Sequence, residues 1–416
     1  MEDQTYFNDD ILLSMNSSYR VPEFKSIRNK DYIPFLDIDK KTQYPDKLIY
    51  FKNHSALHGS ILRNMADQVA GNGIIVDEEG SNIELTKTFL NNFGKEEGIT
   101  EVMQKMSDDL CTFKGIALLI TWSKDGKKII HCDHVDFSKI RSAKANEEDG
   151  KIPGYYYSWD WNTQRPVATC IPAFDTNTMA DKKKKYDEAV NKALSSGKIV
   201  PELQQIISSP QEQLLYFHPY ASNEFYYPLP HYVGAINAIN ADILSDQYAL
   251  GEMENGLSAK HIIIFKGNYT PEQWKKEANA FYKTYINGIK KVRPILHKAK
   301  DNETTIEIKK IDSTGRDEKY TTINASSTQK ILSGHGVTSP MLVGIREAGS
   351  LGGGSELETA EDLFYRNVIR PKQNIMSKII NNILKINDLD SIKIEQLTLM
   401  PKNTEIETET EENKTK

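Results

Sequence analysis

Residues 334–384 read GHGVTSPMLVGIREAGSLGGGSELETAEDLFYRNVIRPKQNIMSKIINNIL and combine three features in a fixed order. A short apolar run comes first, a glycine-rich loop follows, and a long segment with helical periodicity completes the stretch. Four of the six residues from 349 to 354 are glycine. Such a loop can bind a phosphate, act as a spacer between helices or move as a hinge. The residues on either side of the loop help to distinguish these roles.

The residues after the glycines argue against a phosphate site. Ser355 and Glu358 form a predicted capping box at the start of the next helix, and Glu356 adds a second carboxylate in the first turn. These carboxylates stabilise the helix dipole themselves and repel a phosphate from the helix N-terminus. The loop also lacks the Gly-Lys-Ser/Thr ending of a P-loop. A flexible hinge and a plain spacer remain as two open interpretations.

The segment after the loop carries an apolar stripe in which every step is three or four residues, as in an amphipathic helix. We expect the stripe to face the protein core. Pro371 lies within it and predicts a kink, because proline lacks the N–H that an inner helical turn requires. The stripe consists of Leu357, Ala360, Phe364, Val368, Pro371, Ile375, Ile379, Ile383 and Ile386.

The first half of the chain has the pattern of an α+β unit with antiparallel strands. Residues 1 to about 45 are polar with scattered prolines, which predicts an extended arm. Residues 181–213 contain a charged helix that interrupts the strands, and we interpret them as a surface insertion. Helices are predicted over 56–69, 85–92 and 99–109, and strands over 115–122, 127–135, 154–161, 165–174 and 214–220.

Two further helices enclose a small mixed unit. The first is predicted from about 231 to 254, with Asp242 and Asp246 on one face because they are four residues apart. Residues 257–313 then have the order β-α-β-β, with TPEQ (270–273) as a capped helix start. This unit contains twelve Lys or Arg and six Asp or Glu, a net charge of +6, whereas the whole chain carries −6. The second helix is predicted over about 317–333.

Composition argues against several classes of protein. A net charge of −6 does not fit a chain that binds nucleic acid over its whole surface, so such a role must depend on local patches. Three widely separated cysteines suit a reducing compartment and suggest no disulfide framework. No apolar run reaches the roughly 18 residues that span a bilayer, and the acidic N-terminus is unlike a signal peptide. We therefore expect a soluble intracellular protein with no membrane partner and no cofactor.

Three stretches together resemble the portal proteins of tailed bacteriophages and prophages. The strongest is the stretch quoted above, where a V-x-x-P-x-L-x-G segment precedes the glycine loop and a helix with Phe-Tyr and Ile-x-Pro. The others are FYYPLPHYVGAINAINADILSDQY with the later ENGLSAKHIIIF, and NHSALHGSILRNMADQVAGNGI. The resemblance covers about residues 50–400. The matching positions of the first stretch are Val337, Pro340, Leu342, Gly344, Phe364, Tyr365, Ile369, Arg370 and Pro371.

The resemblance implies a portal-type α+β fold with an α/β wing, a two-helix stem, a small clip, a tunnel loop and a long kinked helix. A long helical crown, found in larger members of the family, has no counterpart here. The implied parts are 1–230 wing, with the insertion at about 181–213; 231–256 stem helix; 257–313 clip; 314–342 second stem helix and apolar segment; 343–355 tunnel loop; 356–400 kinked wing helix and final strand; and 401–416 disordered tail.

The resemblance also implies a function. Portal proteins form rings, typically dodecameric, at one capsid vertex, and double-stranded DNA is packaged and ejected through the ring. The implied partners are other copies of the chain, DNA, the major capsid protein, the terminase and a head–tail adaptor. The implied location is the virion, after assembly in the cytoplasm of the bacterial host.

Candidate functional residues follow from the same resemblance. Acidic stem residues that face the channel would keep it weakly repulsive, because dense lysines would bind phosphates and stall the DNA. A solvated outer face is the alternative for the acidic stem residues and for the clip cations alike. The stem candidates are Asp242, Asp246, Glu252 and Glu254; the clip candidates are Lys290, Lys291, Arg293, Lys298, Lys300, Lys309 and Lys310; and the tunnel-loop candidates are Arg346, Glu347, Gly349, Leu351, Gly352, Gly353 and Gly354.

Two other classes of protein stay open as alternatives. One is a different ring or connector protein of a phage-like or gene-transfer particle. The other is a metal-dependent enzyme, suggested by His131-Cys132-Asp133-His134, although strand alternation would place adjacent side chains on opposite faces. No pair of carboxylates and no nucleophile motif stands out, so we predict no catalytic, cofactor-binding or metal-binding residue.

Overall fold

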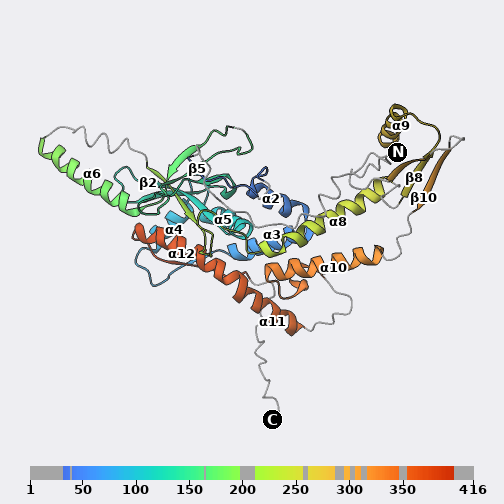
Figure 1. Cartoon of the computed structure of the whole chain (residues 1–416). Coiled ribbons are helices and arrows are strands. Elements are labelled where there is room, and N and C mark those ends of the chain that lie inside the picture. The colour runs from blue at the N-terminus through green and yellow to red at the C-terminus, as the bar shows by residue number, and fades with distance from the viewer. Residues whose placement is uncertain are drawn as a thin grey trace, which may run out of the picture. The chain divides into compact units, whose positions relative to one another are not determined.

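The computed structural model describes residues 31–37, 40–163, 165–196, 211–255, 261–285, 295–299, 305–310, 316–345 and 354–397. Contacts within the chain divide it into two compact units. Unit 1 comprises Met1–Ile61 and Leu229–His335, and unit 2 comprises Leu62–Pro228 and Gly336–Lys416. Helices and sheets occur in both units (Figure 1), as predicted for an α+β fold. Within the described ranges, no helix combines the length and the apolar character needed to cross a membrane.

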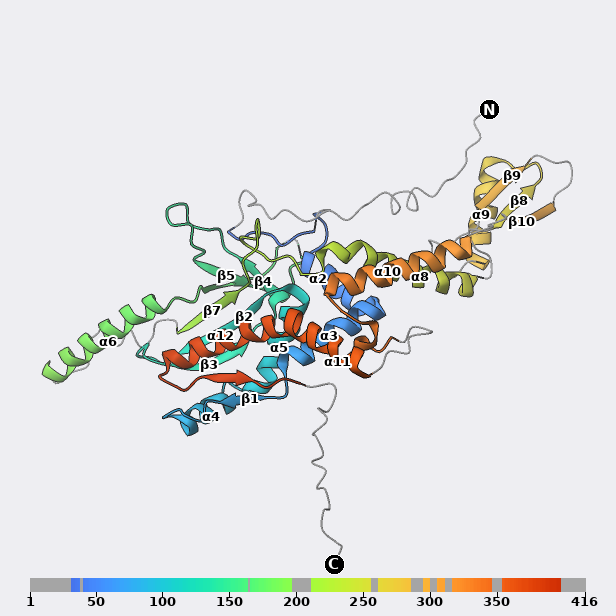
Figure 2. The ribbon, with the colours of Figure 1, turned by 90° about the horizontal axis from the view of Figure 1, so that it is seen from below.

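Unit 1 is built around two long helices, α8 (Ile236–Asn255) and α10 (Arg316–His335). They run side by side in Figures 1 and 2. A 3-10 turn over Val233–Ala235 precedes α8, and α3 (Ala56–Ala70) begins in this unit. Both long helices lie where the sequence predicted them.

The helix α2 (Tyr44–His54) was missed by the sequence analysis, which treated residues up to about 45 as an extended arm. Pro45 was taken as a loop signal, but it occupies the first turn of α2, where the missing N–H of proline is tolerated. Within unit 1, α2 contacts α8 and buries Tyr44, Leu48 and Phe51.

A small sheet lies between the two long helices in the sequence. Its elements are β8 (His261–Lys266), α9 (Pro271–Tyr285), β9 (Ile295–Ala299) and β10 (Thr305–Lys310), which confirms the predicted β-α-β-β order. The strand order is β10-β8-β9, with β9 parallel and β10 antiparallel to β8. The capping box of α9 forms as predicted, because Gln273 N–H donates to Thr270 Oγ1 at 3.2 Å and Thr270 N–H donates to Gln273 Oε1 at 2.9 Å.

Unit 2 contains two antiparallel three-stranded sheets, in agreement with the predicted antiparallel character. In the first, β2 (Ile116–Trp122) lies between β3 (Ile129–His134) and β7 (Glu212–Phe217). The second has the order β4-β5-β6, and its strand β4 was not predicted. Its strands are β4 (Ile140–Ser142), β5 (Gly154–Tyr157) and β6 (Thr169–Pro172).

Helices and a terminal strand pair complete unit 2. The helix α5 (Ile99–Phe113) contacts β2 and β3, and α4 (Ile83–Asn91) contacts β1 (Ile74–Val76). The strand β1 pairs antiparallel with β11 (Ile392–Ile394), so the predicted final strand returns to this unit. The insertion contains α6 (Thr176–Ser196), and its residues 197–210 lie outside the described part of the chain.

The C-terminal helix is interrupted before Pro371. After a 3-10 turn (Pro340–Val343), α11 (Gly354–Phe364) leads into a π-helix over Tyr365–Ile369, and α12 (Arg370–Ile386) follows directly. The N–H of Arg370 donates to the carbonyl of Tyr365, five residues earlier, which is the π-helical spacing. The irregular turn therefore comes just ahead of the proline that cannot donate its own hydrogen bond.

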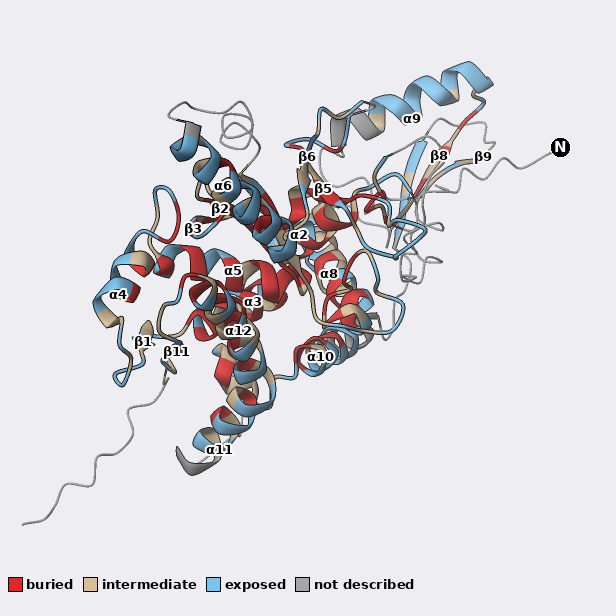
Figure 3. Ribbon diagram, turned by 90° about the vertical axis from the view of Figure 1, so that its left-hand side faces the viewer, coloured by how far each residue is buried: buried red, intermediate tan, exposed pale blue. Residues whose placement is uncertain are grey.

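The π-helix changes which side chains are buried. The predicted stripe ran through Val368, Pro371 and Ile375, yet Ile369 and Met376 are buried while Pro371 is exposed. Because the wider turn places the next buried position, Ile369, five residues after Phe364, the three-or-four spacing breaks at this point. Ile379 and Ile383 of the predicted stripe are buried as expected. Figure 3 shows the resulting buried face of α12, which consists of Gln373, Met376, Ile379, Ile380, Ile383 and Leu384.

One side chain joins the end of α12 to the edge of β3. Asn387 donates from Nδ2 to the carbonyl of Ile129 and accepts from the N–H of Ile129 at Oδ1, both at 2.8 Å. Asn387 is buried, so removing its amide leaves a buried donor and a buried acceptor unsatisfied.

We expect Asn387→Ala to lower the free energy of unfolding by about 2–4 kcal/mol. Asn382→Ala, at an exposed position of the same helix, is the matched control and should change it by no more than about 0.5 kcal/mol. Chemical denaturation followed by circular dichroism measures both values. Equal effects of the two substitutions would contradict the role assigned to Asn387.

Candidate functional site

The two long helices of unit 1 are packed unevenly along their length. Ile239 and Ile243 of α8 and Ile331 of α10 are buried, whereas Leu250 is 50% exposed and Ile323 is 47% exposed. The start of α8 and the end of α10 thus form the well-packed base of the pair, and the other half of each helix offers apolar surface to solvent.

Three histidines meet at this base and form a hydrogen-bonded chain. His58 comes from α3, His231 from the turn before α8, and His335 is the last residue of α10. The two ring-to-ring distances are 2.8 Å, from His58 Nδ1 to His335 Nε2, and 3.1 Å, from His335 Nδ1 to His231 Nε2. Because His335 uses both ring nitrogens, one of them donates and the other accepts when the ring is neutral.

Burial favours the neutral form of His58. His58 and His335 are fully buried, and the buried ring of Tyr232 lies 4.5 Å from His58 and 5.0 Å from His335, centre to centre. Burial, with a smaller contribution from Lys52, lowers the pKa of His58 from 6.5 to about 3. The sequence analysis did not identify this cluster. Each of the three stretches that carry the portal resemblance contributes one histidine, but nothing in their spacing indicates that the three side chains meet.

The acidic residues of α8 occupy different environments. Asp242 is half-buried and accepts a 2.7 Å hydrogen bond from the hydroxyl of Ser55, whose oxygen also accepts from the N–H of His58. Asp246 is exposed, and its pKa is raised by partial burial and by the neighbouring charge of Asp242. Glu252 and Glu254 lie in the last turns of α8. Asp242 therefore serves the packing of unit 1, and of the two candidates whose side chains the structure describes, Asp246 is the one that reaches solvent.

The described cations of the small sheet are partly engaged. Lys298 donates from Nζ to the carbonyl of Tyr269 at 2.6 Å, and Lys309 forms an ion pair of 3.6 Å with Glu307. Lys266 also pairs with Glu307, at 3.0 Å. Lys310 ends β10, and the other predicted cations lie outside the described residues. These are Lys290, Lys291, Arg293 and Lys300.

Most of the predicted tunnel loop lies outside the described residues. Of the loop over 343–355, the structure describes residues 343–345, 354 and 355, and Gly354 is the one candidate residue among them, as the first residue of α11. Arg346, Glu347, Gly349, Leu351, Gly352 and Gly353 belong to the part of the chain that is not described.

The strand motif His131-Cys132-Asp133-His134 does not converge on one point. His134 pairs through Nε2 with the buried carboxylate of Asp109 at 2.8 Å, whereas Asp133 accepts from the N–H of Lys95 at 2.8 Å. Burial raises the pKa of Asp109 to about 6, although its hydrogen bond with His134 acts in the opposite direction. Among the described residues, no group of His, Cys, Asp and Glu has a geometry that could hold a metal ion.

Comparisons with known proteins place this architecture among particle-neck chains. No family model and no curated protein matches the sequence. A chain in the neck of an empty GTA (gene transfer agent) particle, computed with C6 symmetry, matches with a TM-score of 0.52, 15% identity, and coverage of 85% of this chain and 84% of that one. A chain in the neck of the native GTA particle, computed with C12 symmetry, matches with a TM-score of 0.51, 15% identity, and coverage of 86% and 85%.

These matches establish similarity of fold, because identities of 15% do not carry over a function. They show that this chain shares its fold with chains from the necks of phage-like particles. A match to an HK97 family phage portal protein from Corynebacterium diphtheriae has a TM-score of 0.44 at 9% identity, over 83% of this chain and 95% of that one. That likeness is too low to add to the argument.

The histidine chain predicts an acid-sensitive stability. Folded His58 binds its proton with a pKa of about 3 and an unfolded histidine with one of 6.5, so the folded chain holds fewer protons between these pH values. The free energy of unfolding should therefore fall as the pH decreases from 6.5 toward 3, with a limit of about 5 kcal/mol from this group.

In His58→Gln, which does not titrate, the fall below pH 6.5 should be shallower, while the lost ring contacts should lower stability at pH 7 by about 1–3 kcal/mol. Urea denaturation at pH 7, 6, 5 and 4 measures both effects. Parallel curves for the wild type and the variant would show that the buried ring does not control this dependence.

Proposed function

We propose that this chain is a portal or connector protein of a tailed phage, a prophage or a gene-transfer particle, and that it assembles as a homo-oligomeric ring. The observation that carries the proposal is the fold shared with neck chains over about 85% of each chain. Because those chains are parts of assembled particles, the virion is the proposed location. The role is structural, and no catalytic step is assigned to any residue.

The proposed ring has twelve subunits. The two neck reconstructions named above were computed with C6 and C12 symmetry, and twelve copies are compatible with both. A ring arises when a chain carries two different surfaces that fit each other head to tail and the rotation between copies closes.

The proposed parts of the subunit follow the portal architecture. The α8 and α10 helices are the stem, the sheet β8-β9-β10 with α9 is the clip, and the α/β elements of residues 1–230 with α11, α12 and β11 are the wing. The loop over 343–355 is the tunnel loop. The apolar residues exposed on the outer halves of α8 and α10, Leu250, Met253 and Ile323, support packing against neighbouring stems, since isolated helices seldom leave such residues in water.

In the proposed mechanism the channel lets double-stranded DNA slide. Phosphate–lysine contacts release counterions and bind DNA tightly, so an open passage favours few unpaired cations and some negative charge. Asp246 is exposed and suits such a lining, and each copy in a ring repeats its charge. The proposed partners are DNA, the major capsid protein, the terminase and a head–tail adaptor.

Electron microscopy of the purified full-length chain tests the ring. Class averages viewed along the axis should show closed rings with a central hole and twelve-fold symmetry. Monomers or compact dimers at micromolar concentration and moderate salt would contradict the proposal.

The glycine-rich loop gives a separate prediction, which distinguishes a hinge from a spacer. Replacing Gly352, Gly353 and Gly354 by alanine restricts the backbone without adding charge. Rings should still assemble, while DNA packaging by particles that carry the variant should decrease several-fold. Unchanged packaging would leave the loop as a spacer.

A further inference from the structure

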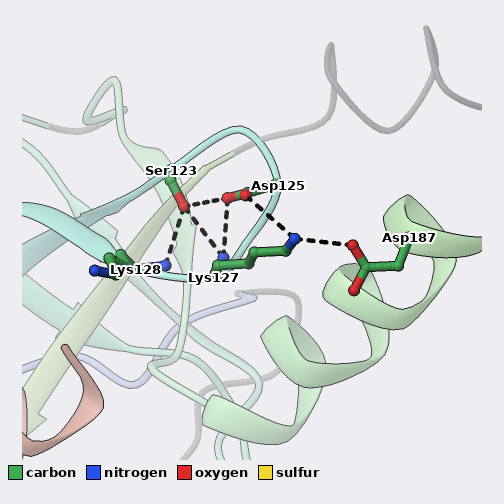
Figure 4. Close-up of polar contacts among 5 residues, drawn as sticks. All are labelled: Ser123, Asp125, Lys127, Lys128 and Asp187. Carbon is green, nitrogen blue, oxygen red and sulfur yellow. Dashed lines mark hydrogen bonds and ion pairs between the residues drawn. The ribbon is translucent and has the colours of Figure 1, made fainter. Parts of the chain in front are cut away.

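The helix α6 is fixed to the turn between β2 and β3, as Figure 4 shows. Lys127 of this turn forms an ion pair of 2.9 Å with Asp187 of α6 and lies 4.0 Å from Asp125, which Ser123 orients by a 2.5 Å hydrogen bond. The backbone approaches closely at Gly126, where an added Cβ would lie 3.2 Å from the carbonyl oxygen of Met179. Met179 and Ala189 of α6 are buried. The insertion helix is thus docked on the sheet and presents a defined outer face.

The exposed part of α6 carries three consecutive lysines, which the helical step of about 100° per residue spreads around roughly half of the helix. Lys183, Lys184 and Lys185 are exposed, and among the described residues they make no hydrogen bond or ion pair. Asp187 lies four residues after Lys183, the spacing of a helical ion pair, but its carboxylate is bound to Lys127 instead. Asp181 and Glu188 also lie three or four residues from Lys184 and Lys185, but the described structure shows no ion pair between these carboxylates and the lysines. The helix therefore holds three adjacent lysines that no described carboxylate pairs with.

An acidic tip lies on the same unit, in the turn between β4 and β5. Its exposed side chains are Glu147, Glu148 and Asp149. The tip is closed by backbone hydrogen bonds, from Asn146 N–H to Lys151 O at 2.8 Å and from Gly150 N–H to Asn146 O at 2.9 Å. Gly150 has φ +69°, a left-handed conformation that favours glycine, so the turn is locally specified.

Within one chain the described structure shows no ion pair between this acidic tip and the lysines of α6. We propose, on the basis of the ring described above, that the lysines Lys183–Lys185 of one copy contact the acidic tip Glu147–Asp149 of the next copy. Each surface has three charged side chains, and the two surfaces are opposite in charge. The lysines lie on the helix α6, and the acidic residues lie on a hydrogen-bonded turn. Two different, complementary surfaces on one chain are what a head-to-tail ring requires.

This contact determines which surface of the next copy is bound and how the two copies are aligned, and it adds little to the affinity between them. Exposed ion pairs add little affinity, but like charges placed opposite each other are strongly unfavourable and oppositely charged patches accelerate encounter. Assembly of the wild type should accordingly slow by about tenfold or more between 50 mM and 500 mM salt, because salt screens exposed charges.

Charge reversal tests the contact directly. One variant carries Lys183→Glu, Lys184→Glu and Lys185→Glu, and the other carries Glu147→Lys, Glu148→Lys and Asp149→Lys. Each variant alone should lose at least about nine-tenths of its rings in electron micrographs and in size-exclusion chromatography. An equal mixture of the two should recover rings, because alternating copies place opposite charges at every contact.

The controls separate this inference from its alternatives. A triple variant with Lys378→Glu, Lys385→Glu and Lys393→Glu, also exposed in unit 2, changes the net charge by the same amount and should form rings. Circular dichroism checks that every variant is folded. Rings from either reversed variant alone would overturn the contact, as would rescue only when both reversals are in one chain, which indicates an intramolecular pair.

Two further outcomes assign the charged surfaces elsewhere. If the lysine variant forms rings normally but no longer binds duplex DNA or the capsid protein, the lysines serve that partner and the inference is wrong. If the wild type forms no rings at all, the proposed function itself fails, and the contact between copies fails with it.

Discussion

The helix pair of unit 1 depends on a base that other segments hold in place. Toward their distal ends α8 and α10 expose Leu250, Met253 and Ile323, whereas the buried apolar side chains described on the pair lie at its base. At the base, a chain of imidazoles joins the end of α10 to the turn before α8 and to α3. Neutral imidazoles can satisfy one another in a dry environment, which a carboxylate–lysine pair could do only at a large desolvation cost.

Much of the fold could be predicted from local patterns. Strand-like runs located β2, β3, β5, β6 and β7 of unit 2 but not β4, and the Thr270–Gln273 capping box located the start of α9. The predictions failed where a feature depends on distant residues or on irregular helix geometry. The helix α2 begins at a proline that also fits a loop, and the π-helix before Pro371 moves burial from Val368 to Ile369, a shift that no regular periodicity encodes.

Only part of the candidate site could be predicted from the sequence. The spacing of Asp242 and Asp246 correctly placed both residues on α8, but it could not show that Ser55 binds the first and leaves the second in solvent. The three histidines lie in segments separated by more than a hundred residues, so their meeting depends on the tertiary fold. The local sequence shows a histidine next to the end of a long helix. Many buried histidines that have ordinary hydrogen-bond partners occur in the same position, so this feature does not predict a cluster.

The order of elements in unit 1 has a consequence for divergence between relatives. The strands β8, β9 and β10 and the helix α9 lie in one continuous stretch between the end of α8 and the start of α10, and within the described part of the chain these strands pair with one another and with no other strand. The entropy of closing such an excursion grows only with the logarithm of its length. Insertions, deletions and changes of charge in this sheet and in α9 can therefore accumulate between relatives. The helices α8 and α10 and the hydrogen-bonded histidines at their base can stay unchanged.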